Sequence, residues 1–153
     1  GGQINNRRFR AIAKLADDIE LPFVAPKKFR PTRRAHQAVL LMDYIDPANT
    51  PLLMDRMFEA IWVKELDIES PQVLSELIAD SEIPTDLLER VVLSDELKPA
   101  ISVSVNKALK WGITGTPSWV IDNKLMVPGL QEDDFFDRVI TKLAANRAEI
   151  REP

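Results

Sequence analysis

Apolar side chains recur every three or four residues over most of the chain, which is the spacing of one face of an α-helix. The pattern predicts seven helices, separated by connections in which proline, glycine or acidic residues interrupt the repeat. The sixth begins at Ser94 or Lys98, and the last follows Gly129. The predicted helices cover residues 6–20, 32–46, 51–66, 70–78, 85–92, 94–112 and 130–146.

The apolar stripes of these helices define the expected core, and polar residues mark where three of the helices begin. Thr32, Thr50 and Ser70 stand where a side-chain oxygen can accept a hydrogen bond from a free N–H group. Pro51 and Pro71 follow two of them, in a first turn where a missing N–H costs nothing. The expected core residues are Phe9, Ile12, Ala13, Ala16, Ile19, Ala35, Ala38, Val39, Met42, Ile45, Leu53, Met54, Met57, Phe58, Ile61, Trp62, Val73, Leu74, Leu77, Ile78, Leu87, Leu88, Val91, Val92, Ile101, Val105, Ala108, Leu109, Phe135, Phe136, Val139, Ile140 and Leu143.

One stretch departs from the helical pattern, residues 112–129, which read GITGTPSWVIDNKLMVPG. Two short runs rich in β-forming residues, 118–122 and 125–127, are joined through Asp122-Asn123-Lys124. Asp and Asn tolerate the left-handed conformation of a tight turn, so this spacing predicts a β-hairpin. Pro117 comes directly before the first strand, where a strand can begin without a donor.

Both predicted strands are apolar in nearly every position, with Trp119, Val120 and Ile121 in the first. Such runs are typical of a sheet that is covered on both faces. A lone hairpin is marginal in water and needs further strands or a helical cover. We therefore expect partner strands outside this sequence, in an N-terminal segment or in another chain.

The composition indicates one globular domain with a core: 153 residues, 45% hydrophobic and 29% charged. A net charge of −4 argues against a nucleic-acid partner, because phosphate binding needs a concentrated positive surface. No apolar run reaches the roughly 18–20 residues of a membrane helix, and nothing resembles a signal peptide. We expect a cytoplasmic protein without a membrane partner.

The chain contains no cysteine and one histidine, His36. These counts exclude a disulfide framework, a thiolate metal site, a CxxC redox pair and a histidine metal cluster within the sequence. Any sulfur chemistry must therefore use a thiol from elsewhere.

Four stretches carry a resemblance to a known family: 26–29 (PKKF), 60–68 (AIWVKELDI), 70–74 (SPQVL) and 112–125 (GITGTPSWVIDNKL). Over residues 7–143 the chain resembles the DsbA-like thioredoxin-fold family. Within it, the 2-hydroxychromene-2-carboxylate isomerases and kappa-class glutathione transferases are the most similar. The family's opening strand, turn and helix have no counterpart here. In the family that part carries either CxxC or the serine set against the glutathione sulfur, so we expect the catalytic residue outside this chain.

The resemblance implies an α/β, thioredoxin-like fold that is mostly α by content. Residues 1–111 would form a large inserted all-helical domain. Residues 112–146 would form the C-terminal half of the thioredoxin-like domain, with its cis-proline hairpin and helix. Residues 147–153 are expected to be a frayed tail.

The resemblance also implies a place for glutathione. The main chain of Thr116 would bind the cysteinyl part like an added strand, with Pro117 beside the sulfur. The turn at Leu130 and Gln131 would hold the γ-glutamyl end at the N-terminus of the last helix. The glutathione enzymes tend to carry a polar residue and then Asp in that turn, and Leu130 and Gln131 depart from this pattern.

Three further residues are candidates for a pocket: His36, Trp62 and Trp119. Each also has an ordinary structural interpretation, His36 with a polar partner at a domain boundary and the tryptophans as packing.

Three functions stay open. The first is a glutathione-dependent isomerase or transferase. The second is a DsbA-like thiol-disulfide oxidoreductase whose CxxC lies outside this chain. The third is a non-catalytic binding module. The expected partners are a small-molecule thiol or an extended peptide, and a second copy of the chain or a completing N-terminal fragment.

Overall fold

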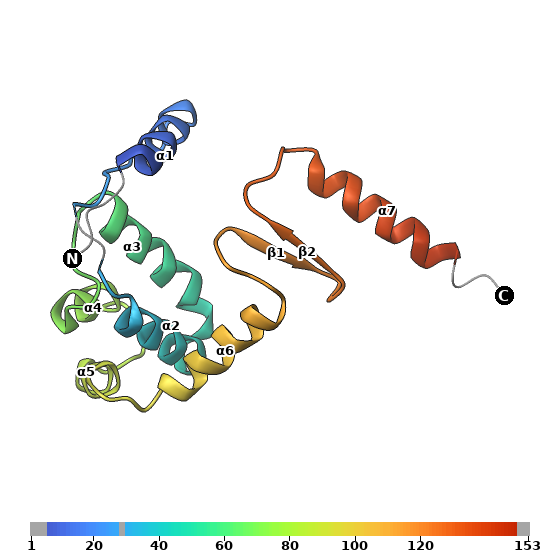
Figure 1. The fold of residues 1–153 in the computed structure, drawn as a ribbon. Coiled ribbons are helices and arrows are strands. Elements are labelled where there is room, and N and C mark those ends of the chain that lie inside the picture. Colours follow the sequence, from blue (N-terminus) through green and yellow to red (C-terminus); the bar gives the residue numbers. More distant parts are fainter. Residues whose placement is uncertain (1–5, 28–29, 150–153) are drawn as a thin grey trace. The chain divides into compact units, whose positions relative to one another are not determined.

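The computed structural model describes residues 6–27 and 30–149 (Figure 1). Backbone contacts divide the chain into two units, residues 1–102 and 103–153, and helix α6 runs across the division. The predicted domain boundary after residue 111 falls just beyond the end of α6.

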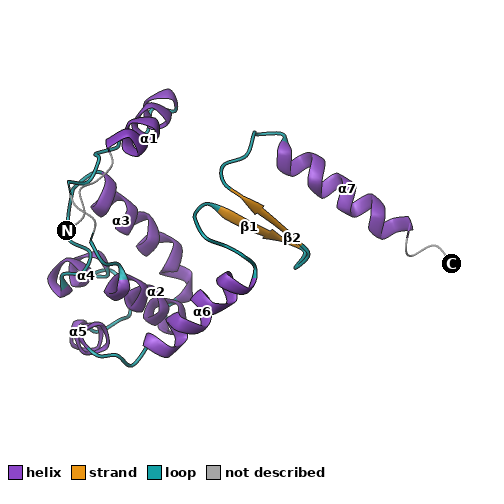
Figure 2. Ribbon diagram, in the orientation of Figure 1, coloured by secondary structure: helices purple, strands orange, loops and turns teal. Residues whose placement is uncertain are grey.

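All seven predicted helices and the hairpin are present (Figure 2), and one short 3₁₀ helix, η1, is added to them. The elements are α1 (Asn6–Asp18), α2 (Arg33–Ile45), η1 (Pro47–Asn49), α3 (Thr50–Trp62), α4 (Pro71–Leu77), α5 (Thr85–Leu93), α6 (Lys98–Lys110), β1 (Ser118–Ile121), β2 (Leu125–Pro128) and α7 (Phe135–Glu149).

The core of the first unit lies between α2, α3, α4 and α5. Helix α2 is central, because it packs against each of the other three. Ala38, Leu74 and Leu88 have no exposed surface, and burying a leucine of this kind contributes about 1.5–3 kcal/mol. The buried residues of this core are Ala35, Ala38, Leu41, Met42, Leu53, Met57, Ala60, Ile68, Leu74, Ile78, Ile83, Leu88, Val91 and Val92.

A buried glutamine joins two of these helices. Gln37 on α2 donates from Nε2 to the carbonyl oxygens of Val91 (3.1 Å) and Ser94 (2.9 Å) at the C-terminal end of α5. The last carbonyls of a helix lack the usual partner one turn further on, and Gln37 adds to the bonds that Ser94 already makes to Val91. The hydrophobic periodicity of α2 does not predict this contact.

Several predicted helix ends are wrong by a few residues. Helix α3 has Asn49 at its N-cap, with Thr50 inside the helix, because η1 leads directly into it. It ends at Trp62 and not at residue 66, since the chain turns through Val63 and then Glu65, which has φ +53°. Thr32 does occupy the N-cap of α2, but its side chain makes no capping hydrogen bond.

Part of the predicted core is exposed. Helices α1 and α3 bury only the residues that face their neighbours, so the outer members of their stripes meet solvent. None of the residues of α6 is buried, although its stripe predicts a buried face. The predicted core residues that are exposed are Ile12, Ile19, Met54, Phe58, Val105, Leu109 and Ile140.

In the second unit, β1 and β2 form an antiparallel pair with Ser118 opposite Pro128 and Ile121 opposite Leu125. Asp122 and Asn123 have φ of +55° and +51°, and the Lys124 N–H donates to the Ile121 carbonyl over 3.1 Å. This is the tight turn that the Asp-Asn pair predicts, because these side chains tolerate a left-handed backbone.

Helix α7 is joined to the hairpin at both ends. Near its start, Phe136 packs edge-on against Trp119, with ring centroids 4.9 Å apart. Near its end, Arg147 forms an ion pair with Asp122 in the hairpin turn. Residues 147–149, expected in a frayed tail, are therefore helical, and the rest of that tail lies outside the described residues.

Two leucines of α5, one buried and one exposed, should differ greatly in how much they contribute to the free energy of unfolding. Replacing Leu88 by Ala opens a cavity in the packed interior and lowers the free energy of unfolding by about 2–5 kcal/mol. Replacing Leu93 by Ala, at a side chain 60% exposed, changes it by less than about 0.5 kcal/mol. Urea unfolding followed by far-ultraviolet circular dichroism measures both, and equal losses would contradict this core.

Candidate functional site

The loop before β1 is held by two hydrogen bonds. The Ser118 hydroxyl donates to the Gly115 carbonyl over 2.6 Å, and the Gly129 N–H donates to the Pro117 carbonyl over 2.8 Å. The Thr116–Pro117 peptide bond between them is cis, the isomer expected from the resemblance. These contacts fix the main chain of the loop to both strands of the hairpin.

The register of the hairpin shows which main-chain groups remain available. The bond from Gly129 to Pro117 joins the residues just outside the Ser118–Pro128 pair, so Ser118 and Pro128 do not bond each other. Hydrogen-bonded and non-hydrogen-bonded pairs alternate along an antiparallel ladder. Ser118 and Val120 both belong to non-hydrogen-bonded pairs, so their N–H and C=O groups point away from β2. Within residues 6–27 and 30–149, no other strand pairs with this outer edge of β1.

The faces of the hairpin are also incompletely covered. Trp119 is 46% exposed although it contacts Phe136, and Val120 and Leu125 are exposed as well. Val127 is the single buried strand residue. An edge with unpaired main-chain groups and apolar faces is a template for an added strand.

The turn after β2 differs from what the resemblance implies. Gln131 folds back, and its Nε2 donates to the Pro128 carbonyl over 2.9 Å, so the amide stabilises the turn. Leu130 is 70% exposed and can offer only main-chain groups to a ligand. Because α7 begins at Phe135, Leu130 and Gln131 do not lie in its first turn, and the expectation that they do is wrong.

Three carboxylates, Glu132, Asp133 and Asp134, separate that turn from α7. They repel an incoming carboxylate and attract an ammonium group. The turn therefore suits a positively charged group better than a carboxylate.

The three pocket candidates lie in different surroundings. His36 is exposed on α2, and its main-chain N–H donates to Thr32 within the start of that helix. Trp119 belongs to the hairpin of the second unit. Trp62, at the end of α3, lines a cavity of about 610 Å³ within the first unit, and His36 is not among the residues that line it.

The cavity lies between the end of α3, the loop after it and the extended segment before α2. Prolines 22 and 26 keep that segment out of a helix, and the Val24 N–H holds it to the Trp62 carbonyl over 2.6 Å. The lining residues are Pro26, Lys27, Arg30, Thr32, Ile61, Trp62, Glu65, Leu66 and Ile68. Of these lining residues, only Trp62 was a pocket candidate from the sequence. Ile61, also on α3, was expected in the core, and most of the others lie outside the helices.

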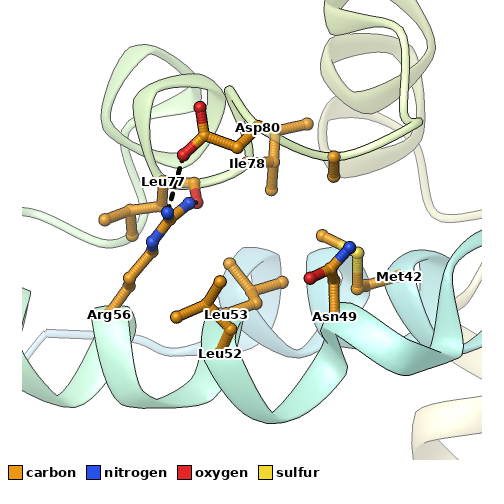
Figure 3. A pocket seen from close by; sticks show the side chains of 9 residues that line it. Met42, Asn49, Leu52, Leu53, Arg56, Leu77, Ile78 and Asp80 are labelled. Atoms are coloured by element: carbon orange, nitrogen blue, oxygen red, sulfur yellow. Dashed lines mark hydrogen bonds and ion pairs between the residues drawn. The ribbon is translucent and has the colours of Figure 1, made fainter.

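A second hollow, beside α3 and α4, is too small for a ligand (Figure 3). Its volume is about 10 Å³, which is close to the space of one water molecule. Arg56 closes one side, with bonds to Asp80 (2.7 Å) and to the Leu77 carbonyl (2.9 Å).

Two kinds of site are not found in the described part of the chain. Residues 6–27 and 30–149 hold no group of three or more His, Asp or Glu side chains able to bind a metal ion. No helix within these ranges has the length and apolar character needed to span a bilayer.

The strand register predicts alternating amide exchange in the hairpin. The amides of Trp119 and Val127 face the partner strand and exchange slowly, whereas those of Val120 and Met126 face outward and exchange faster. Hydrogen–deuterium exchange followed by NMR measures the four rates. Equal rates, or the reverse alternation, would show that the outer edge of β1 is not the one described.

In a comparison with family models, residues 6–141 match the DSBA-like thioredoxin domain. A search of curated proteins gave no match. The matched residues run from α1 into α7 and so include the hairpin and its Thr116–Pro117 loop. With its helices and its short antiparallel sheet, the chain has an α/β, thioredoxin-like fold that is mostly helical, and it belongs to the DsbA-like thioredoxin family.

Proposed function

We propose that this chain serves a glutathione-dependent isomerase or transferase, of the type of the 2-hydroxychromene-2-carboxylate isomerases, and that it binds the thiol compound at the loop before β1. The observation that carries the proposal is an edge with outward main-chain groups that follows Thr116–Pro117, in a chain without cysteine. Because these residues include no thiol, sulfur chemistry at this loop needs a thiol from outside them, and a bound thiol compound supplies one.

The residues fit one part of glutathione well. Its cysteinyl unit has one N–H and one C=O, which match the main-chain groups of Thr116 in the manner of an added antiparallel strand. The bonds from Ser118 to Gly115 and from Gly129 to Pro117 hold the loop in position for this contact. A preformed site of this kind loses little conformational freedom on binding.

The fit is weaker at the γ-glutamyl end. Gln131 can accept a hydrogen bond from the ammonium through Oε1, because Nε2 is engaged with Pro128. Glu132 and its acidic neighbours favour the same ammonium. When bound, glutathione supplies the thiol that the chain lacks, and the chain's own part is to hold and orient it.

A second candidate is a DsbA-like thiol-disulfide oxidoreductase with CxxC outside this chain. The free edge of β1 favours it to the same degree, because an extended peptide adds to a strand edge by the same main-chain bonds. A third candidate is a binding module without catalysis, since the chain's own residues include no cysteine nucleophile.

Glutathione titration tests the proposal. In a chain with Trp62→Phe and Trp111→Phe, Trp119 is the remaining tryptophan and lies on the strand after Pro117. We expect a saturable change in its fluorescence at millimolar glutathione, corresponding to about −4 kcal/mol of binding free energy. S-methylglutathione should bind equally, because the main-chain contacts do not use the thiol.

Two substitutions at one position separate main-chain binding from side-chain effects. Thr116→Pro removes the N–H donor and should abolish the response, whereas Thr116→Ala keeps that donor and should retain it. No saturable response up to about 10 mM glutathione would overturn the proposal, since such a site would be weaker than about −3 kcal/mol. An equal fluorescence response of Thr116→Pro and Thr116→Ala would also overturn the proposal.

Insulin reduction separates the second candidate from the first. This chain has no cysteine and should give no turnover above the background rate with dithiothreitol. Protein produced with the coding region upstream of Gly1 should give turnover if that region supplies CxxC, and turnover would then favour the oxidoreductase.

A further inference from the structure

The cavity beside Trp62 has the features of a ligand site. Its volume of about 610 Å³ is within the roughly 300–1,000 Å³ of small-molecule pockets. All its lining residues belong to the first unit, so it is independent of the loop on which the proposed function rests.

The apolar wall is held in place without a ligand. The ring of Trp62 stacks on Phe23 at 5.7 Å and meets Phe9 at 6.2 Å, which fixes one of its sides. Among the described lining residues, the apolar side chains other than this ring are aliphatic: Pro26, Ile61, Leu66 and Ile68.

The charged side chains of the cavity wall form two ion pairs, one of which is loose. Among the described lining residues Lys27 and Arg30 are cations and Glu65 is the one carboxylate. Arg30 pairs with Asp67, and Lys27 Nζ lies 3.3 Å from Glu65 Oε2. The Lys27 side chain is 84% exposed and that of Glu65 38%, so this second pair is a weak, exchangeable contact.

We propose that the cavity binds a small aliphatic carboxylate. Its alkyl chain lies against Trp62 and Leu66, and its carboxylate takes the place of Glu65 beside Lys27. Glu65 is thus a competitor built into the site, which occupies the ammonium until the ligand replaces it. A cationic ligand would face Glu65 together with Lys27 and Arg30, and a neutral one would make no use of these charges.

Octanoate and 1-octanol test the charge requirement, because they differ only in the head group. In the full chain with Trp111→Phe and Trp119→Phe, Trp62 alone reports binding. We expect octanoate to change its fluorescence saturably and to bind about fivefold more tightly than 1-octanol.

Three substitutions test the parts of the site. Glu65→Gln removes the competitor and should tighten octanoate binding about threefold, with 1-octanol unchanged. Lys27→Gln should weaken octanoate about fivefold, again with 1-octanol unchanged. Leu66→Gln, at a half-exposed side chain, should weaken both ligands.

Glu59→Gln and Lys64→Gln are matched controls. Glu59 and Lys64 pair with each other at 3.1 Å, are half exposed and are not among the residues that line the cavity. Replacing each by Gln changes the net charge by the same amount as Glu65→Gln and Lys27→Gln do. They should leave octanoate binding unchanged. The proposal is wrong if octanoate gives no saturable signal or if 1-octanol binds as tightly as octanoate. It is also wrong if Glu65→Gln does not tighten octanoate binding, or if the control variants change that binding as much as Glu65→Gln and Lys27→Gln do.

Discussion

The pairing of β1 with β2 is the interaction on which the candidate site depends. It places Gly129 against the Pro117 carbonyl and so holds the loop that carries Thr116. The same register directs the main-chain groups of Ser118 and Val120 outward, because bonded and non-bonded pairs alternate in an antiparallel ladder. One hairpin therefore decides both where the loop lies and which edge can receive an extended ligand.

The two units differ in how far they bury their own apolar surface. The first has a core of helices α2 to α5 with fully buried side chains such as Leu74 and Leu88. The second buries little besides Val127, and α7 is joined to the hairpin by Phe136 and Arg147. A two-stranded sheet with half-exposed apolar faces gains stability from any strand added to it. Exposed apolar side chains and unpaired main-chain groups thus lie on the same hairpin.

The chain has no cysteine, and this bears on both proposed ligands of the edge, glutathione and an extended peptide. Under the proposed function, the loop before β1 holds a sulfur compound, and the residues of this sequence include no cysteine to exchange electrons with it. Glutathione and an extended peptide present the same main-chain groups to such an edge, so they are separated by their thiol chemistry and not by the edge itself. The cavity beside Trp62 is a distinct feature, made by chain segments of the first unit alone.

The sequence by itself determined the elements and the family. Helical spacing predicted all seven helices, because apolar residues recur every three or four positions in each of them, although α6 buries none of its residues. Asp122-Asn123 predicted the hairpin turn, because few residues adopt a left-handed backbone. The tertiary structure decided which members of each stripe are buried, as Leu53 is and Phe58 is not, since burial depends on the neighbouring helix. It also decided the cavity walls at Lys27 and Glu65 and the contact of Gln131 with Pro128. Those contacts join residues from irregular segments, whose positions follow from packing and not from a repeating pattern along the chain.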